Sequence, residues 1–382
     1  MEPAAELTGE ERARYARQLL LPGVGELGQR RLKAARVLVV GAGGLGSPAL
    51  LYLAAAGVGT LGVVDGDDVS ESNLHRQVLH GTADVGRPKV DSAADAVARL
   101  NPLVRVVTHP GRLTVENALE VVSGYDLVVD GSDNFGTRYL VNDACVLAGV
   151  PWVWGAVLRF DGQVAVFWDG RGPTYRDLFP APPPPGTVPS CGEAGVLGAV
   201  CAAVGSAMVT EALKLITGAG RSLLGQVLVH DALAGTWRSL RLAPDPRRAP
   251  VTALEPVEGA PDREPSPEAA GADGADAPDV PEVEAAELAH RLRERAAGRD
   301  GFVLVDVREP DEHAAHAIPG SVLVPLAELL ADPARVPAGQ PVVLHCAGGT
   351  RSARALRALR GSGRDDVVHL RGGIAAWDAA GA

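Results

Sequence analysis

The sequence predicts two α/β units, a larger doubly wound one followed by a smaller one. Apolar runs alternate with segments of helical periodicity from Arg36 onwards, and residues 244–281 interrupt that alternation before it resumes. The chain has 382 residues, more than the ~250–300 at which a single core usually stops growing. We therefore expect a first domain at 1–243, a linker at 244–281 and a second domain at 282–382.

The first domain is predicted to contain a mainly parallel sheet. Apolar runs at 37–40, 61–65, 104–107 and 126–130 are typical of buried parallel strands, and the segments 47–56 and 90–100 have the spacing of crossover helices. Strands at 152–157 and 163–168 flank an Asp-Gly hairpin turn. A proline-rich strap at 171–191, an apolar helix at 195–217 and a closing hairpin at 226–242 follow.

The linker and the second domain differ sharply in composition. Residues 244–281 hold no aromatic residue and are rich in Pro, Ala, Gly, Asp and Glu, which favours an extended, flexible tether. The second domain is predicted to have a helix at 283–297, strands at 302–307, 342–346 and 367–370, and a helix beginning at Ser352.

Composition and charge argue against several functions. A formal net charge of -11 disfavours a general binder of nucleic acid or of membrane surfaces, since both need a basic face. The four cysteines form no Cys-x-x-Cys pair, which argues against a disulfide framework and against a zinc ligand set. No signal peptide is evident, and we expect no segment to approach the ~20 apolar residues that span a bilayer. The cytoplasm is the expected compartment.

A glycine-rich turn follows the first strand. Residues 41–46 read Gly-Ala-Gly-Gly-Leu-Gly, and Asp65 ends the next strand. Such a turn lets backbone N–H groups and a helix N-terminus face phosphates, while the carboxylate can hold ribose hydroxyls. Gly41, Gly43, Gly44 and Asp65 are therefore candidate nucleotide ligands. Taken alone, the turn does not distinguish NAD from other nucleotides.

Polar residues beyond the next strands favour ATP. Residues 65–77 form a polar run that includes Arg76, Lys89 follows it, and Asp133 and Asn134 lie just past the strand at 126–130. Cations stabilise the charge that develops as pyrophosphate leaves, and a carboxylate such as Asp133 can hold Mg²⁺ against phosphate oxygens. A nicotinamide-dependent oxidoreductase has no evident use for Arg76, Lys89 and Asp133 together, but it remains an alternative.

These motifs resemble those of the MoeB/ThiF family, relatives of the ubiquitin-activating enzymes. GAGGLG, VDGD, SNLHRQ, GRPK and DGSDN stand in the family's order between Arg14 and Asp231. The resemblance implies a Rossmann-like domain that adenylates the C-terminal glycine of a ubiquitin-like sulfur carrier protein. Arg17 resembles an arginine that reaches across a homodimer into the partner's site, although an exposed helix arginine is the other interpretation. The nucleotide contacts that the resemblance adds to those above lie in the polar run and after it: Ser72, Asn73, Leu74, His75, Arg76 and Lys89.

Cysteine usage departs from the family pattern. Members commonly carry two Cys-x-x-Cys pairs that bind zinc, but here the first stretch reads Thr174-Tyr175-Arg176-Asp177 and no cysteine follows the closing hairpin until Cys346. We therefore predict no zinc, as in MoeZ-type fusion proteins. Cys191 precedes a helix and resembles a cysteine proposed to attack the acyl-adenylate, although it could be an ordinary loop cysteine. Cys145 and Cys201 lie in apolar helical stretches and are expected in the core.

A second candidate site follows a strand of the smaller domain. The strand at 342–346 ends on Cys346, and the loop Ala-Gly-Gly-Thr leads to Arg351, Ser352 and a helix. Such a loop turns N–H groups inward with a helix dipole behind them, which stabilises an anion that the cysteine can supply. Cys346 is the predicted nucleophile, and Arg351 is expected to add positive charge.

The second domain resembles the rhodanese family. Besides the Cys346 loop, the landmarks are residues 306–313, 316–321 and 371–377. The resemblance implies that Cys346 carries sulfane sulfur as a persulfide, supplied by thiosulfate or by a desulfurase that carries a persulfide. Asp306 and Arg308 are expected to form a structural ion pair.

Together these observations predict an adenylyltransferase and sulfurtransferase. The first domain would adenylate a carrier that ends in Gly-Gly, and the Cys346 persulfide would convert that end to a thiocarboxylate. A homodimer is expected, without nucleic acid or membrane as partner. The sequence leaves the pathway open (molybdopterin is one candidate), and a non-catalytic scaffold that binds the carrier remains a second alternative.

Overall fold

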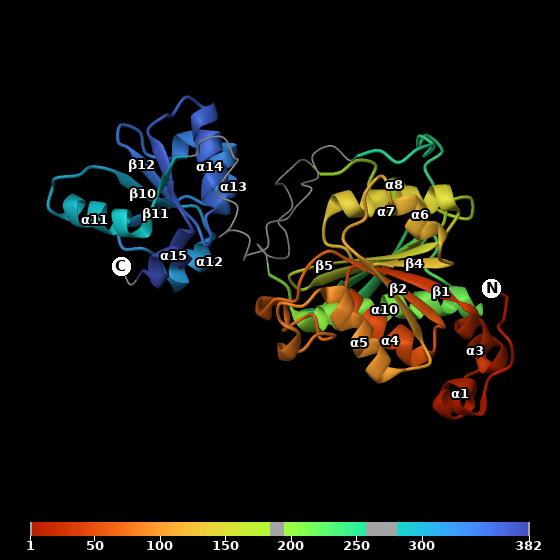
Figure 1. Cartoon of the computed structure of the whole chain (residues 1–382). Helices are drawn as coiled ribbons and strands as arrows, with labels where there is room; N and C mark the ends of the chain where they lie inside the picture. Colours follow the sequence, from red (N-terminus) through yellow and green to blue (C-terminus); the bar gives the residue numbers. More distant parts are fainter. Residues whose placement is uncertain (1, 184–194, 257–280, 381–382) are drawn as a thin grey trace. The chain divides into compact units, whose positions relative to one another are not determined.

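The computed structural model describes residues 2–183, 195–256 and 281–380 of the chain. It divides into two compact units, Met1–Glu264 and Pro265–Ala382, so the division falls within the predicted linker. Each unit has its own sheet and its own buried core (Figure 1). The sequence-derived α/β class is confirmed for both.

The sheet of the first unit has the order β3-β2-β1-β4-β5-β6-β7-β8. The first five strands of this order are parallel and the last three are antiparallel. Chain order reverses between β1 and β4, where a doubly wound sheet opens a crevice at the carboxyl ends of its strands. The strands are β1 (Arg36–Val40), β2 (Thr60–Asp65), β3 (Arg105–Pro110), β4 (Leu127–Asp130), β5 (Trp152–Leu158), β6 (Asp161–Phe167), β7 (Gln226–Asp231) and β8 (Thr236–Arg241).

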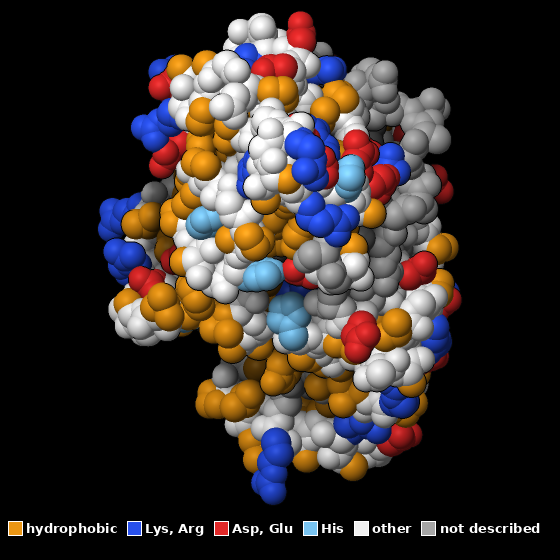
Figure 2. Space-filling model, turned by 90° about the vertical axis from the view of Figure 1, so that its left-hand side faces the viewer, with side chains coloured by type: hydrophobic (Ala, Val, Ile, Leu, Met, Phe, Trp, Pro, Cys, Tyr) orange, Lys and Arg blue, Asp and Glu red, His pale blue; other side chains and the backbone are white. Residues whose placement is uncertain are grey.

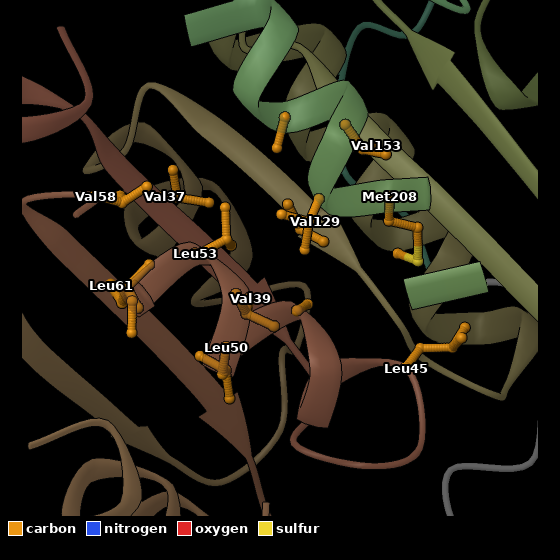
Figure 3. Close-up of a cluster of buried hydrophobic side chains, with 14 of the residues drawn as sticks. Val37, Val39, Leu45, Leu50, Leu53, Val58, Leu61, Val129, Val153 and Met208 are labelled. Carbon is orange, nitrogen blue, oxygen red and sulfur yellow. The ribbon is translucent and has the colours of Figure 1, made fainter. Parts of the chain in front are cut away.

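Helices cover both faces of this sheet, as the continuous apolar strands predict (Figure 1). One face packs on α4 (Gly46–Ala56), α5 (Lys89–Leu100) and α10 (Gly198–Thr217). Figure 3 shows this core, where Leu50 and Leu53 of α4 and Met208 of α10 lie among valines of the strands. The other face packs on α6 (Ala118–Ser123), α7 (Phe135–Ala148) and α8 (Tyr175–Leu178). Three further helices precede the sheet in the chain: α1 (Gly9–Arg14), α2 (Ala16–Leu19) and α3 (Gly25–Ala34).

The helix α10 corrects the expectation that no segment approaches bilayer-spanning length. It has 20 residues with a mean hydropathy of 1.6, so by length and composition it could cross a membrane. Here its apolar side chains, among them Val204 and Met208, belong to the core against the sheet. A central helix of a doubly wound sheet is apolar over most of its surface for this reason.

The first part of the predicted linker lies against the first unit. Arg248 forms ion pairs with Asp169 (2.7 Å) and Asp177 (3.0 Å), and Leu254 packs against the aromatic core beneath α7. Arg248 and Leu254 of the predicted linker are therefore held against the first unit, although most residues around them are exposed. The sequence missed this because their partners are distant in the chain.

The second unit has a five-stranded sheet in the order β11-β10-β12-β13-β9, with every pairing parallel. The strands are β9 (Glu282–Val283), β10 (Val303–Asp306), β11 (Ser321–Leu323), β12 (Val342–His345) and β13 (Val367–Leu370). Helices α13 (Leu326–Ala331) and α14 (Thr350–Gly361) pack on one face, and α11 (Ala285–Ala296) and α15 (Gly373–Ala379) on the other. The short helix α12 (Pro310–Ala315) follows β10.

The helix predicted from Val283 begins instead at Ala285. Val283 pairs with Leu370 as part of the two-residue edge strand β9. So short a strand has no periodicity that a sequence could display.

Charge is mixed over the visible surface. Figure 2 shows Lys and Arg side chains interspersed with Asp and Glu side chains on the face that it presents. The net negative charge is therefore not gathered into one acidic patch on that face.

Candidate functional sites

The glycine loop between β1 and α4 is tied to the end of β2 by Asp65. The backbone N–H of Ala42 donates to one carboxylate oxygen of Asp65 (2.8 Å), and that of Asp67 donates to the other (2.9 Å). Burial raises the pKa of Asp65 against the opposing effect of Lys89. Each carboxylate oxygen retains a lone pair, so Asp65 can still accept a hydrogen bond from a ribose hydroxyl.

The third glycine of the motif, Gly46, makes the closest approach within the loop. A Cβ at Gly46 would lie 1.8 Å from the carbonyl oxygen of Gly41. A Cβ at Gly44 would lie 2.9 Å from Cys201 Sγ, on the helix that packs behind the loop. The requirement for glycine is thus steric at both positions, and Gly46 was not among the predicted ligands although the motif contains it.

Lys89 lies at the N-terminus of α5 and is nearly buried. Its Nζ contacts Asp67 Oδ2 (3.0 Å), and Arg112 Nη2 contacts Asp67 Oδ1 (3.2 Å). Burial alone would raise the pKa of Asp67, but Lys89 and Arg112 outweigh it and hold that pKa below its ordinary value. A phosphate at this place would compete with Asp67 for Lys89.

The turn at 71–76 arranges the predicted phosphate-binding arginine. Arg76 donates to the side-chain oxygen of Asn73 (2.7 Å) and to the carbonyl of Ser72 (3.3 Å). His75 Nδ1 lies 3.1 Å from the same carbonyl, and Leu74 is half-buried. Asn73 therefore orients the Arg76 guanidinium, and this role does not depend on a direct contact between Asn73 and the nucleotide.

The loop after β4 leaves Asp133 exposed. The Ser132 N–H donates to Asp130 Oδ1 (2.9 Å), and Arg138 donates twice to the Ser132 carbonyl (3.2 and 3.1 Å). The Asn134 side chain caps α7 by accepting from the Thr137 N–H (2.8 Å), so its oxygen is already engaged.

Asp133 can supply one carboxylate to a Mg²⁺ site that the phosphates of ATP complete. Among the described residues no three acidic, histidine or cysteine side chains gather as a metal site. Mg²⁺ is commonly held by one or two carboxylates together with substrate phosphates, and Asp133 can supply one of these.

Two buried residues behind the loops were missed by sequence reasoning. His80 bridges the Ala42 carbonyl (2.9 Å) and Ser92 Oγ (2.8 Å), and burial lowers its pKa. Asp130 is fully buried, and burial raises its pKa to about 6. Asp130 stands in the quoted DGSDN motif, but nothing in the sequence marks it as more buried than Asp133.

Arg17 lies on the exposed surface of α2. It borders a hollow of about 460 Å³ that is also lined by Tyr15, Gln18 and Leu21, and the neighbouring Leu20 is 72% exposed. Within the described part of the chain, no hydrogen bond or ion pair joins Arg17 to the glycine loop.

Cys346 lies at the end of β12 with its sulfur inside the following loop. The backbone N–H of Gly349 (3.1 Å) and that of Ser352 (3.4 Å) donate to Sγ, at the N-terminus of the 12-residue helix α14. The first turn of α15 supports the loop from behind, where the Ile374 N–H donates to the Cys346 carbonyl (2.8 Å). The Cys346 side chain is 1% exposed. Such a loop stabilises a sulfur anion.

Two arginines near this loop have acidic partners. Arg351 makes two parallel hydrogen bonds to Glu312 (2.7 and 2.8 Å). These bonds are the largest of the causes that lower the pKa of Glu312. The predicted Asp306–Arg308 ion pair is confirmed at 2.7 Å and is buried.

Two of the other cysteines have the predicted environment. Cys145 and Cys201 are buried in the two cores of the first unit, and burial raises the pKa of Cys145 well above its ordinary value. Cys191 lies outside the described residues.

In the stretch 174–177, Asp177 accepts hydrogen bonds from the Thr174 N–H (2.6 Å), the Asp245 N–H (2.9 Å) and Arg248 (3.0 Å). These bonds join the stretch 174–177 to the segment after the closing hairpin. The absence of zinc stays a prediction.

Comparison with known proteins identifies both units. A model of the ThiF family matches residues 15–251, and a model of the rhodanese-like domain matches residues 285–380. The probable adenylyltransferase/sulfurtransferase MoeZ of Mycobacterium tuberculosis is 51% identical over 99% of this chain and 95% of its own length. The chain belongs to the ThiF family and carries a rhodanese-like domain.

Other relatives match parts of the chain. The sulfur carrier protein adenylyltransferase of Thermus thermophilus is 59% identical over 66% of this chain and 94% of its own. A crystal structure of E. coli MccB with MccA-N7isoASN shares the fold of the first unit, with a TM-score of 0.57 and 20% identity over 64% of this chain and 77% of that one.

The chain is thus an enzyme with adenylyltransferase and sulfurtransferase units, and its ThiF unit uses ATP. This favours the adenylyltransferase over the oxidoreductase and scaffold alternatives.

Proposed function

We propose that this protein adenylates the C-terminal glycine of a ubiquitin-like sulfur carrier protein and then converts it to a thiocarboxylate with sulfur from Cys346. The relatives named adenylyltransferase and sulfurtransferase support carrier activation and sulfur transfer in general. The observation that carries the specific proposal is the presence on one chain of two strand-end loops, one suited to phosphates and one that surrounds a thiol.

The first unit would prepare the acceptor. A carboxylate resists nucleophilic attack because attack adds charge to an anion, and joining it to AMP supplies a good leaving group. Lys89 and Arg76 would stabilise the charge on departing pyrophosphate, and Asp65 would hold the ribose. Asp133 would hold Mg²⁺, which shields phosphate charge when bound.

The second unit would deliver the sulfur. The terminal sulfur of a Cys346 persulfide would attack the acyl carbon and expel AMP, leaving an acyl disulfide. A thiol then attacks Cys346 Sγ, and the electron pair of the broken S–S bond passes to the carrier's sulfur as the thiocarboxylate. We propose Cys191 as that thiol; the Cys191–Cys346 disulfide that it forms would be reduced by a small-molecule thiol before the next turnover. The tether raises the effective concentration of one unit at the other.

Several features of the proposal concern assembly. The exposed Leu20 and Leu21 beside Arg17 suit a homodimer in which Arg17 enters the partner's nucleotide site. We also propose a cytoplasmic location, and thiosulfate or a persulfide-carrying desulfurase as donor.

The central test separates the two half-reactions. Asp133→Ala is expected to abolish ATP–pyrophosphate exchange with a carrier ending in Gly-Gly, whereas Cys346→Ala should retain exchange and yield no thiocarboxylate with thiosulfate. Intact mass of the carrier reports the product, and mixing Arg17→Ala with Asp133→Ala should restore part of the exchange if the dimer shares its sites. Thiocarboxylate formation by Cys346→Ala at the normal rate would contradict the sulfur relay.

A further inference from the structure

A chain of buried polar side chains leads away from the Cys346 sulfur. The hydroxyl oxygen of Ser352 lies 3.5 Å from Sγ and 3.3 Å from Nδ1 of His369 on β13. On the other side of the ring, His369 Nε2 lies 3.2 Å from Glu282 Oε1 on the edge strand β9. Ser352 and His369 are 0% and 3% exposed, so the path from sulfur to imidazole excludes water.

The Ser352 hydroxyl can both donate and accept a hydrogen bond, so it can relay a proton between Cys346 Sγ and His369 Nδ1. Ser352 Oγ is also 2.9 Å from the Gly349 carbonyl, and its single proton can point to that carbonyl, to Sγ or to Nδ1. With Nε2–H donating to Glu282, the lone pair of Nδ1 faces Ser352. Ser352 can then take a proton from the thiol while giving its own to the ring.

The charges around His369 come from three elements. Burial lowers the pKa of His369, Glu282 opposes this shift, and Arg357 of α14 adds to it. Arg371, just beyond β13, also contacts Glu282 and places a positive charge beside that carboxylate. Glu282 thus lies where its carboxylate can stabilise the ring once the ring is protonated.

The other buried histidine near the sulfur belongs to a different cluster. His345 lies 3.8 Å from Asp306, and burial lowers its pKa to about 4. Its neighbour in sequence, Cys346, is bonded to the loop and to Ser352 instead. His345 thus provides a control for burial that touches the backbone of Cys346 but is not bonded to its Sγ.

We propose that His369, acting through Ser352 and held by Glu282, is the positioning residue that receives the Cys346 thiol proton and so supplies the sulfur-accepting thiolate. This inference rests on the proposed role of Cys346 in sulfur transfer. As the Sγ–H proton moves to Ser352 Oγ, the Ser352 proton moves to Nδ1, leaving a thiolate and an imidazolium. The thiolate then attacks the sulfane sulfur of thiosulfate, the S–S bond breaks, and its electron pair leaves with sulfite.

The test titrates the thiol in the full-length protein. Ultraviolet thiolate absorbance is measured against pH in wild type and in His369→Asn, each corrected by the same protein carrying Cys346→Ala. The asparagine side chain can still bond to Ser352 but cannot take a proton, so the Cys346 thiolate should appear at higher pH in this variant than in wild type. His345→Asn, which carries a similar cost of burial, should leave the Cys346 titration unchanged.

A kinetic measurement completes the test. The rate of Cys346 persulfide formation with thiosulfate, followed by intact mass, should fall at neutral pH by roughly tenfold or more in His369→Asn and recover at alkaline pH. An unchanged thiolate titration, or a rate lowered by the same factor at every pH, would overturn the proposal by showing a purely structural role. The titration needs no sulfur transfer, so wild type that titrates as expected but forms no persulfide would contradict the proposed function while supporting the proton path.

Discussion

The loop at 41–46 and the loop at 346–350 each leave the C-terminal end of a parallel strand and lead into a helix. The first is secured from outside, because Asp65 of the next strand and His80 bond to Ala42. The second closes on its own side chain, because Gly349 and Ser352 donate to Cys346 Sγ. The same strand-loop-helix arrangement thus suits the phosphates of a bound nucleotide in the first unit and the sulfur anion of Cys346 in the second.

The two sites also bury opposite kinds of titratable group. Below the first loop lies Asp130, a carboxyl group with a pKa raised by burial. Next to Cys346 lies His345, an imidazole with a pKa lowered by burial. In both cases burial disfavours the charged form of the group, a carboxylate in the first unit and an imidazolium in the second.

Replacing the glycines of closest approach should have the largest effect on both units. A Cβ at Gly46 meets the Gly41 carbonyl oxygen at 1.8 Å, and one at Gly373, where φ is 60°, meets the Cys346 carbonyl oxygen at 2.4 Å. Gly46→Ala and Gly373→Ala should each lower the free energy of unfolding of their own unit by roughly 3 kcal/mol or more. Hydrogen exchange measured by mass spectrometry resolves the two units.

The control for the glycine variants is Gly348→Ala, since no atom lies within 4 Å of a Cβ there. It should change stability by less than about 0.5 kcal/mol. A stable Gly373→Ala protein would show that the sulfur loop does not depend on the turn behind it.

The two buried titratable groups, Asp130 and His345, predict opposite pH dependences of stability. Folding raises the pKa of Asp130 from 3.8 to about 6, so the first unit loses stability as pH rises through that window. Folding lowers the pKa of His345 from 6.5 to about 4, so the second unit loses stability as pH falls through that window. Each difference corresponds to roughly 3 kcal/mol at full effect.

Asp130→Asn and His345→Leu should each flatten the pH dependence of one unit and leave the other unchanged, as followed by hydrogen exchange between about pH 4 and pH 7. The same pH slope in variant and wild type would mean that another group sets it.

The smallest effects are expected from replacing the acidic residues that form ion pairs with Lys89 and Arg351. Asp67→Asn removes a competitor for Lys89, and Glu312→Gln removes one for Arg351. We expect ATP to bind a few-fold more tightly in the first variant and the KM for thiosulfate to fall a few-fold in the second, as for partly exposed ion pairs. Asp95→Asn, at an exposed pair with Arg87, should change neither value. Weaker ATP binding by Asp67→Asn would show that this acid takes part in binding.

Local sequence was sufficient for the longer strands and for the reactive loops. Apolar runs predicted β1, β2 and β4, and glycine spacing predicted the turn at 41–46, because strand burial and turn geometry depend on neighbouring residues. The Cys346 loop was predicted for the same reason, since strand, loop and helix follow one another within a few residues.

Tertiary structure alone decided what stands behind those loops. His369 and Glu282 are far apart in the chain and meet because β13 pairs with β9, a strand too short to predict. The burial of Asp130 likewise depends on packing between β4 and α7, whereas the sequence shows only that an acid stands there. Residues that touch a ligand lie in local motifs, but the groups that set their protonation come from distant strands, and only the folded sheet brings these together.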